Sequence, residues 1–196
     1  MTLTTANLKQ HIGFSGIRWL QYQDELDAFI ALMQREGVRS YLETGAHHGD
    51  TMHAVGCALP EGSRIVGVDL PGATAGRYKD SWKSMQRAVH DLRSRGRDAH
   101  ALIGDSHDPK VVKAAAALGP FDAVFIDGDH TAAGVRADWR DYGSLARIVG
   151  FHDISRAVET KKCGVQSFYR ELCQTHRHAE FAYHDGWRGI GVVWRE

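Results

Sequence analysis

Tyr41-Leu-Glu-Thr-Gly-Ala-His-His-Gly49, followed by Ile65-Val-Gly-Val-Asp69, is the stretch of sequence that decides the fold. The first segment is an apolar run that ends in Glu43 and a Gly-x-x-x-Gly turn, and the second is an apolar run that ends in Asp69. A parallel strand that passes through a glycine-rich turn into a helix presents backbone N–H groups to a ligand, and an acid that ends the next strand can accept hydrogen bonds from ribose hydroxyls. The stretch therefore predicts a nucleoside site on a parallel sheet.

The spacing of the glycines narrows the choice of ligand. The dinucleotide fingerprint Gly-x-Gly-x-x-Gly does not occur at this turn, which reads Glu43-x-Gly45-x-x-x-Gly49. This pattern resembles the first motif of the class I S-adenosylmethionine-dependent methyltransferases. The resemblance implies that the turn wraps the methionine end of the cofactor and that Asp69 binds the ribose. Ala46, Thr51 and Leu70 are also expected to bind the cofactor, as is Asp127 at the end of a later strand. The alternative is an ordinary strand-turn-helix whose glycines serve backbone conformation.

Composition limits the class of protein and its partners. A chain of 196 residues is long enough for one domain with a substantial core. Lys plus Arg equal Asp plus Glu at 24 each, and the basic residues are scattered, so we expect a small-molecule substrate and neither nucleic acid nor membrane as a partner. Three cysteines at unrelated spacings, with no apolar signal or membrane-spanning run, favour a cytoplasmic protein. A homo-oligomer is left open.

Segments of helical period alternate with short apolar runs, which is typical of a parallel sheet covered on both faces. Parallel strands are predicted at 40–43, 64–69, 99–103, 123–127 and 147–152, with the very apolar run 123–127 in the centre. Helices are predicted at 24–37, 50–58, 80–95, 109–118, 131–145 and around 165–175. The tail predicts an antiparallel hairpin, 180–184 and 189–194, on a tight turn at Asp185-Gly186.

The predicted fold is therefore a single-domain, doubly wound α/β fold of Rossmann-like type. Its five parallel strands and C-terminal antiparallel hairpin form the methyltransferase sheet, as the resemblance implies. We expect residues 1–23 to be an N-terminal extension and residues 24–196 to be the methyltransferase domain.

Polar residues end all five predicted parallel strands, where ligands of such sheets lie. They are Glu43, Asp69, Asp105-Ser106, Asp127-Gly-Asp129-His130 and His152-Asp153. A buried carboxylate costs several kcal/mol unless it is paired, hydrogen-bonded or bound to a metal, so the set favours a site. The alternative for Asp105 and Asp129 is a helix cap.

Asp127, His152 and Asp153 suit a divalent cation, since two carboxylates and an imidazole at adjacent strand ends leave positions for water and substrate oxygens. FIDGDH at 125–130, GFHDI at 150–154 and GVQSFYREL at 164–172 resemble the methyltransferase group that includes cephalosporin-hydroxylase-like proteins and macrolide-sugar O-methyltransferases; catechol O-methyltransferase is more distant. The resemblance implies a metal site at Asp127, His152 and Asp153, a base at His130, and Asp105-Ser106 against the adenine.

Two departures from that group bear on the metal. His152 stands where relatives commonly have an acid, which admits Mn²⁺, Fe²⁺ or a zinc-like ion besides Mg²⁺, or no metal at all. The Pro-Gly-Gly turn usual before the fifth strand is missing, so the placement of that strand could slip. Without a metal, His130 would cap the following helix and His152 would fill a core position.

The sequence predicts an S-adenosylmethionine-dependent methyltransferase that methylates a small-molecule hydroxyl, assisted by a divalent cation (Mg²⁺ or Mn²⁺), with Asp127 as anchor and His130 as base. The alternative is a catalytically inactive protein that binds S-adenosylmethionine or another nucleoside and serves as a sensor or assembly component. An NAD-dependent enzyme is disfavoured by the missing fingerprint. Substrate recognition is expected in loops 70–80 and 154–164. Trp19, Tyr22 and Trp82 would line a pocket or belong to the core.

Overall fold

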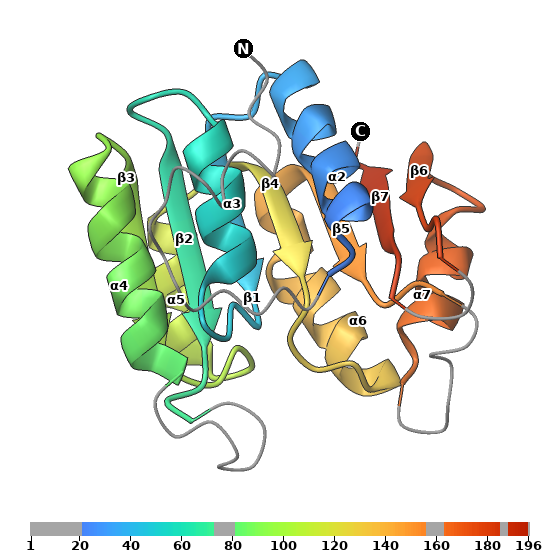
Figure 1. The fold of residues 1–196 in the computed structure, drawn as a ribbon. Helices are drawn as coiled ribbons and strands as arrows, with labels where there is room; N and C mark the ends of the chain where they lie inside the picture. The colour runs from blue at the N-terminus through green and yellow to red at the C-terminus, as the bar shows by residue number, and fades with distance from the viewer. Residues whose placement is uncertain (1–20, 73–80, 156–162, 185–187, 196) are drawn as a thin grey trace.

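A central seven-stranded sheet organises the protein (Figure 1). The structure is a computed structural model, and it describes residues 21–72, 81–155, 163–184 and 188–195. The strand order is β3-β2-β1-β4-β5-β7-β6. The strands are β1 (Ser40–Thr44), β2 (Arg64–Asp69), β3 (Asp98–Ile103), β4 (Phe121–Ile126), β5 (Ala146–His152), β6 (His178–Phe181) and β7 (Ile190–Trp194).

The first five strands are mutually parallel, and β7 pairs antiparallel with both β5 and β6. The very apolar strand β4 lies in the middle of the order, as predicted. The helices are α2 (Gln23–Arg35), α3 (Asp50–Ala58), α4 (Ser81–Ser94), α5 (Pro109–Ala117), α6 (Ala132–Asp141) and α7 (Val165–Leu172). None of these described helices is long and apolar enough to cross a membrane.

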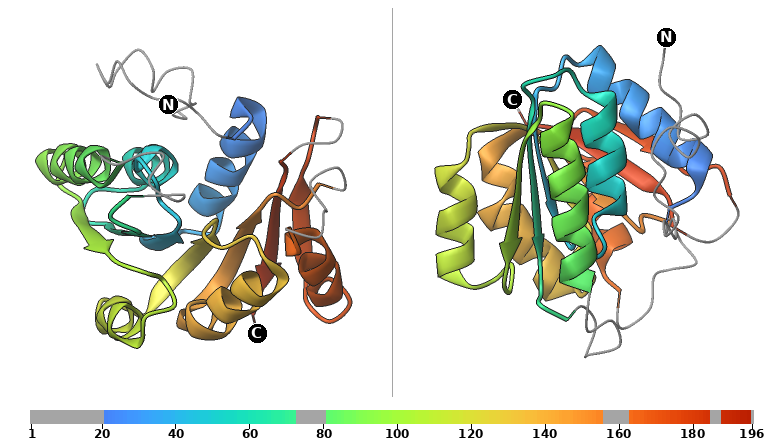
Figure 2. Two further views of the ribbon diagram at one scale, coloured as in Figure 1. Left: turned by 90° about the horizontal axis from the view of Figure 1, so that it is seen from below. Right: turned by 60° about the vertical axis from the view of Figure 1, so that its left-hand side comes forward.

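Helices cover both faces of the sheet. Seen along the strands, α2, α3 and α4 lie on one face and α5, α6 and α7 on the other (Figure 2). Each face has its own apolar core, because parallel strands bury side chains on both sides. Phe29 and Met33 of α2 pack in the first core, and Phe151 of β5 packs with Phe168 of α7 in the second. The predicted doubly wound α/β fold, with five parallel strands and a C-terminal antiparallel pair, is confirmed.

Two local predictions need correction. The predicted helix 131–145 ends at Asp141. A 3-10 turn at Gly143–Leu145 then leads into β5, at the position where the related methyltransferases have a Pro-Gly-Gly turn. Strand β5 keeps full register with β4, so its placement does not slip. In the tail hairpin, Phe181 pairs with Ile190, so eight residues connect the strands and the tight turn was wrong. Its proposed centre, Asp185-Gly186, lies outside the described residues.

Other predictions concern parts of the chain that the structure does not describe. Residues 1–20 of the predicted extension, including Trp19, are among them, as are most of the two proposed substrate loops, 73–80 and 156–162.

Candidate active site at the carboxyl ends of the strands

The turn after β1 requires glycine at two positions. Gly45 has φ +74°, and a Cβ atom there would lie 2.1 Å from the carbonyl oxygen of Asp127. Gly49 has φ +84° and is the N-cap residue of α3. The backbone N–H groups of Gly45 and Ala46 both donate to the carbonyl oxygen of Val68. The turn is therefore held tightly between β2 and the end of β4.

A small pocket opens at this turn. It is lined by Gln21, Glu43, Gly45, Ala46, His47, His48, Asp50, Thr51 and Asp127. Five residues predicted to bind the cofactor thus come together: Glu43, Gly45, Ala46, Thr51 and Asp127. The pocket is rich in carboxylates, which favour a ligand with positive charge.

Glu43 and Asp69 end neighbouring strands and are both buried. Glu43 accepts a 2.8 Å hydrogen bond from the Tyr41 hydroxyl, and burial raises the pKa of Glu43 well above its usual range. Asp69 Oδ1 accepts from the Leu70 N–H at 2.6 Å, and burial raises the pKa of Asp69 to about 6. Asp69 Oδ2 is buried and has no hydrogen-bond partner among the described residues. A ribose hydroxyl would supply that partner.

The remaining predicted cofactor residues lie along the same edge but do not line the pocket. Leu70 follows β2 and is 43% exposed. Asp105 accepts a turn hydrogen bond from the N–H of His107 and is exposed. Ser106 accepts a hydrogen bond at its carbonyl from Tyr142. The helix N-caps are Asp108 and Thr131 rather than Asp105 and Asp129.

Asp127 is the centre of a cluster beside the pocket. Its Oδ1 lies 3.1 Å from His130 Nε2 and 3.0 Å from His152 Nδ1. The other ring nitrogen of His130, Nδ1, lies 3.1 Å from Asp153 Oδ2. The three residues predicted to hold a metal and the predicted base therefore meet. We call these four residues, Asp127, His130, His152 and Asp153, the His–Asp cluster.

The charges of the His–Asp cluster stabilise one another. Burial alone would raise the pKa of Asp127, but His152 and His130 hold it well below its usual range. Burial alone would lower the pKa of His130, but hydrogen bonds to Asp127 and Asp153 raise it to about 11. His130 is therefore an imidazolium at neutral pH in this arrangement.

The donor set of the cluster fits a divalent cation. One donor atom each from Asp127, His130 and His152 lies within 4.8 Å of the others, so this group contains the predicted base His130 and not the predicted ligand Asp153. His152 is buried, and its Nε2 has no hydrogen-bond partner in the described parts of the chain, so the ring is not a fully satisfied core residue. Two imidazoles and a carboxylate favour borderline metals such as Mn²⁺, Fe²⁺ or Zn²⁺ over Mg²⁺.

Two residues at the site have left-handed backbone conformations without being glycine. Asp153 has φ +61° and His47, in the glycine turn, has φ +50°. Such conformations cost about 1–3 kcal/mol each and concentrate at functional sites. In this conformation the Asp153 carboxylate lies 3.1 Å from His130 Nδ1.

Comparison with known proteins agrees with this geometry. A family model described as a methyltransferase domain matches residues 42–154, more than half of the chain. The chain belongs to this methyltransferase family. The predicted class, the S-adenosylmethionine-dependent methyltransferases, is thereby confirmed. None of the curated proteins compared with this methyltransferase matches it significantly.

Solved structures resemble the methyltransferase over nearly its whole length. An O-methyltransferase from Bacillus cereus in complex with S-adenosylhomocysteine is 17% identical, with a TM-score of 0.66 and coverage of 97% of this chain and 88% of the other. TomG from Streptomyces achromogenes, an O-methyltransferase of tomaymycin synthesis in complex with S-adenosylmethionine, is 16% identical, with a TM-score of 0.63 and coverage of 97% and 86%. An S-adenosylhomocysteine-bound methyltransferase from Podospora anserina is 16% identical, with a TM-score of 0.64 and coverage of 90% and 80%. These similarities establish the fold.

Sequence reasoning missed two residues that shape the site of this methyltransferase. Gln21 donates from Nε2 to Asp127 Oδ2 at 3.1 Å and accepts at Oε1 from the Thr51 hydroxyl at 2.9 Å. No motif marks it, and it precedes the predicted domain. Asp138, fully buried on α6, accepts from the Thr44 hydroxyl at 3.1 Å and lies 3.2 Å from His107 Nε2. An acid on the apolar stripe of that helix was the available signal.

Proposed function

We propose that the methyltransferase binds S-adenosylmethionine in the pocket at the β1–α3 turn and transfers its methyl group to the hydroxyl of a small molecule. The observation that carries the proposal is the position of Asp127, which lines the pocket and also anchors the His–Asp cluster. A methyl donor bound in the pocket and an acceptor bound at the His–Asp cluster would therefore lie next to each other. The structurally similar proteins from Bacillus cereus and Streptomyces achromogenes, both O-methyltransferases, support the transfer to oxygen.

Charge and hydrogen-bonding capacity support this cofactor. Acids line or flank the pocket at Glu43, Asp50 and Asp69, and the sulfonium of S-adenosylmethionine is a cation. The unpaired Asp69 Oδ2 would accept a ribose hydroxyl. The glycine turn would let the backbone approach the methionine part.

Methyl transfer is an in-line displacement. The acceptor oxygen forms a bond with the methyl carbon while the carbon–sulfur bond breaks, and S-adenosylhomocysteine leaves. The hydroxyl must be aligned with that bond and must lose its proton. Asp127, His152 and Asp153 would hold a divalent cation, for which the His152 imidazole favours Mn²⁺ over Mg²⁺, and this cation would lower the pKa of a coordinated hydroxyl.

His130 would accept the proton of the acceptor hydroxyl, and its surroundings set the condition for that role. Its two ring nitrogens contact Asp127 and Asp153, and those contacts raise its pKa to about 11. An imidazolium cannot accept a proton. His130 can be a base only while these carboxylates are engaged elsewhere, as they would be as ligands of a cation.

Titration calorimetry tests the cofactor. We expect binding of S-adenosylmethionine and S-adenosylhomocysteine and no comparable binding of NAD. If neither sulfur compound binds at millimolar concentration, the proposal is wrong.

Removal of the cation tests the acceptor half of the site. We expect EDTA, or Asp153→Ala, to abolish turnover while changing the affinity for S-adenosylmethionine by less than about threefold, because the cation would contact the acceptor rather than the cofactor. Added Mn²⁺ should restore the EDTA-treated enzyme but not the variant. Full activity in EDTA would contradict the metal assignment.

A second candidate is cofactor binding without catalysis, as in a sensor or assembly component. The partners of the Asp127 carboxylate favour this candidate. Its Oδ2 accepts a hydrogen bond from Gln21, and its Oδ1 lies within hydrogen-bond distance of His130 and His152. This arrangement satisfies the carboxylate with no cation. Cofactor binding combined with inactivity towards a broad panel of hydroxyl acceptors in Mg²⁺ and in Mn²⁺ would support this reading.

A further inference from the structure

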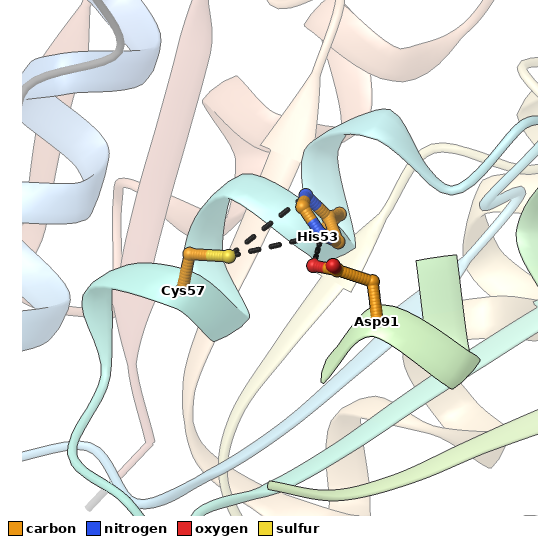
Figure 3. A group of neighbouring side chains, drawn as sticks. All are labelled: His53, Cys57 and Asp91. Atoms are coloured by element: carbon orange, nitrogen blue, oxygen red, sulfur yellow. Dashed lines mark hydrogen bonds and ion pairs between the residues drawn. The ribbon is translucent and has the colours of Figure 1, made fainter. Parts of the chain in front are cut away.

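A second group of metal-ligating side chains lies between α3 and α4, apart from the His–Asp cluster. His53 Nε2 lies 2.7 Å from Asp91 Oδ2, and Cys57 Sγ lies 3.8 Å from His53 Nε2 and 3.9 Å from His53 Nδ1 (Figure 3). One donor atom from each residue falls within 4.8 Å of the other two. None of the three lines the pocket at the glycine turn.

The positions in the two helices explain why these side chains meet. His53 and Cys57 are four residues apart, so they share one face of α3. Asp91 faces them from α4, which packs beside α3 on the same side of the sheet (Figures 2 and 3). His53 and Cys57 are buried, whereas the Asp91 side chain is 26% exposed. The group therefore has two rigid buried donors and one donor that water can reach.

An ion-pair network accounts for part of this arrangement. Asp91 Oδ2 also accepts a 2.6 Å hydrogen bond from Nε of Arg95, the residue that follows α4. The pair of His53 with Asp91 and Arg95 would stabilise the helix contact without any ligand. Cys57 has no part in such a pair, yet its sulfur faces the imidazole at a distance close to that between two ligands of one metal.

The donor chemistry is that of zinc. Nitrogen, sulfur and carboxylate oxygen are the three donor types of protein zinc sites, and Zn–S near 2.3 Å with Zn–N and Zn–O near 2.0–2.2 Å put tetrahedral ligand atoms roughly 3.4–3.6 Å apart. The Cys57–His53 separation is already close to this value. The separation between His53 and Asp91 would have to widen by roughly 0.7 Å, within reach of a partly exposed side chain.

We propose that His53, Cys57 and Asp91 form a zinc site, with water as the fourth ligand, that clamps α3 to α4. On binding, the Cys57 thiol releases its proton to solvent as the Zn–S bond forms. Binding of zinc to His53 Nε2 would replace the hydrogen bond between Nε2 and Asp91 and leave the ring proton on Nδ1. The clamp would act on α3, whose first turn lines the cofactor pocket.

Cobalt reports a thiolate ligand directly. The full chain is stripped with EDTA, freed of chelator and titrated with Co²⁺, whose bond to a thiolate gives a near-ultraviolet charge-transfer band. We expect the band to saturate in the wild-type protein and to disappear on addition of Zn²⁺. Cys57→Ala should abolish the band, and Asp91→Asn, a milder change at the exposed side, should weaken Co²⁺ binding at least tenfold.

Two control variants assign the band to this group. Cys173→Ala alters another potential group, formed with His178 and Glu180, and Asp127→Asn alters the His–Asp cluster. Both should keep the band. A wild-type protein without a band in excess Co²⁺, a band that persists in Cys57→Ala, or a band lost in Cys173→Ala would overturn the proposal.

Thermal unfolding provides an independent readout. At Zn²⁺ a hundredfold above its Kd, the melting temperature of the wild-type protein should rise by roughly 5–10 °C. This rise should be retained in Asp127→Asn and absent from the Cys57→Ala/Asp127→Asn double variant, in which the altered His–Asp cluster cannot supply it. An equal rise in Asp127→Asn and in the double variant would contradict the zinc clamp.

Discussion

Asp69 is a buried acid with one satisfied and one unsatisfied oxygen. Its Oδ1 accepts from the backbone of Leu70, and its Oδ2 has no hydrogen-bond partner in the described structure. Burial raises its pKa to about 6. In its ionised form it can accept two hydrogen bonds, and in its protonated form it loses an acceptor.

The raised pKa predicts a pH dependence of cofactor binding. Above pH 6 Asp69 is ionised, and below pH 6 it is protonated, so the Kd for S-adenosylhomocysteine should rise as the pH falls from 7 to 5. Asp69→Asn should bind about 2 kcal/mol more weakly, roughly thirtyfold, and lose most of this dependence. Calorimetry across the pH range measures both effects.

Asp50→Asn is the matched control, because burial raises the pKa of Asp50 to about 6 as well. If the pH dependence of the Kd disappears in Asp50→Asn and persists in Asp69→Asn, the ribose role of Asp69 is wrong.

A measurement of protein stability separates an effect of Asp69→Asn on cofactor binding from an effect on folding. A raised folded pKa means that ionised Asp69 destabilises the fold as the pH rises from about 4 to 6. Asp69→Asn should therefore not lower the melting temperature at pH 7.

His130 offers a second prediction at the scale of one residue. Replacement by Ala should lower kcat by about 10²- to 10⁴-fold if it accepts the proton of the acceptor hydroxyl. The affinity for S-adenosylmethionine should change little, because His130 does not line the pocket. Unchanged kcat in His130→Ala, measured at saturating acceptor, would remove the base role.

The turn between β1 and α3 shows how one element depends on its neighbours. Gly45 lies against the backbone of Asp127, so the end of β1 and the end of β4 approach more closely than any side chain would allow. This approach sets the distance between the pocket and the His–Asp cluster. The glycine is required by packing as well as by its φ value.

Gly45→Ala should therefore lower the free energy of unfolding by more than about 3 kcal/mol and abolish cofactor binding, since strain and a backbone clash add. Gly37→Ala is the matched control. Gly37 has φ +66°, and a Cβ there would meet nothing within 4 Å. It should cost only about 1–2 kcal/mol, from strain alone, and leave binding intact. Urea unfolding and calorimetry measure these effects, and equal costs for the two variants would refute the packing argument.

At the scale of the whole molecule, the sequence predicted those features of the fold that depend on a local sequence pattern. The apolar run 123–127 predicted the central position of β4, because strands buried on both faces have continuous apolar sequence. The strand-end acids were found because parallel strands end on one edge of the sheet. Glu43 and Asp127, which line the pocket, followed from the same rule, whereas Gly45, Ala46 and Thr51 followed from the resemblance of the glycine turn to the methyltransferase motif.

What the sequence could not predict depends on contacts between distant residues. Gln21 reaches Asp127 across 106 positions, and no local pattern marks such a pair. The charge state of His130 depends on Asp153, which has a left-handed backbone conformation that no local sequence pattern marks. The length of the final hairpin connection depends on where β7 pairs rather than on the Asp185-Gly186 pattern.

Ligand binding should stabilise the whole domain. At S-adenosylhomocysteine a hundredfold above its Kd, the free energy of unfolding should rise by about 2.7 kcal/mol and the melting temperature by roughly 5–10 °C. At the same concentration Asp69→Asn should gain only about 2–3 °C, because its Kd is higher. Differential scanning fluorimetry measures both shifts, and no shift with the wild-type protein would argue against the pocket.

Asp127 lines the cofactor pocket and also belongs to the His–Asp cluster. Any effect of cation binding on cofactor binding through this residue must therefore be reciprocal. If a cation on Asp127 changes the affinity for the methyl donor by some factor, the methyl donor changes the affinity for the cation by the same factor. Gln21, which bonds Asp127 Oδ2 and the Thr51 hydroxyl, connects the same two events. Since removal of the cation should change the affinity for the methyl donor by less than about threefold, the methyl donor should change the affinity for the cation by no more than that factor.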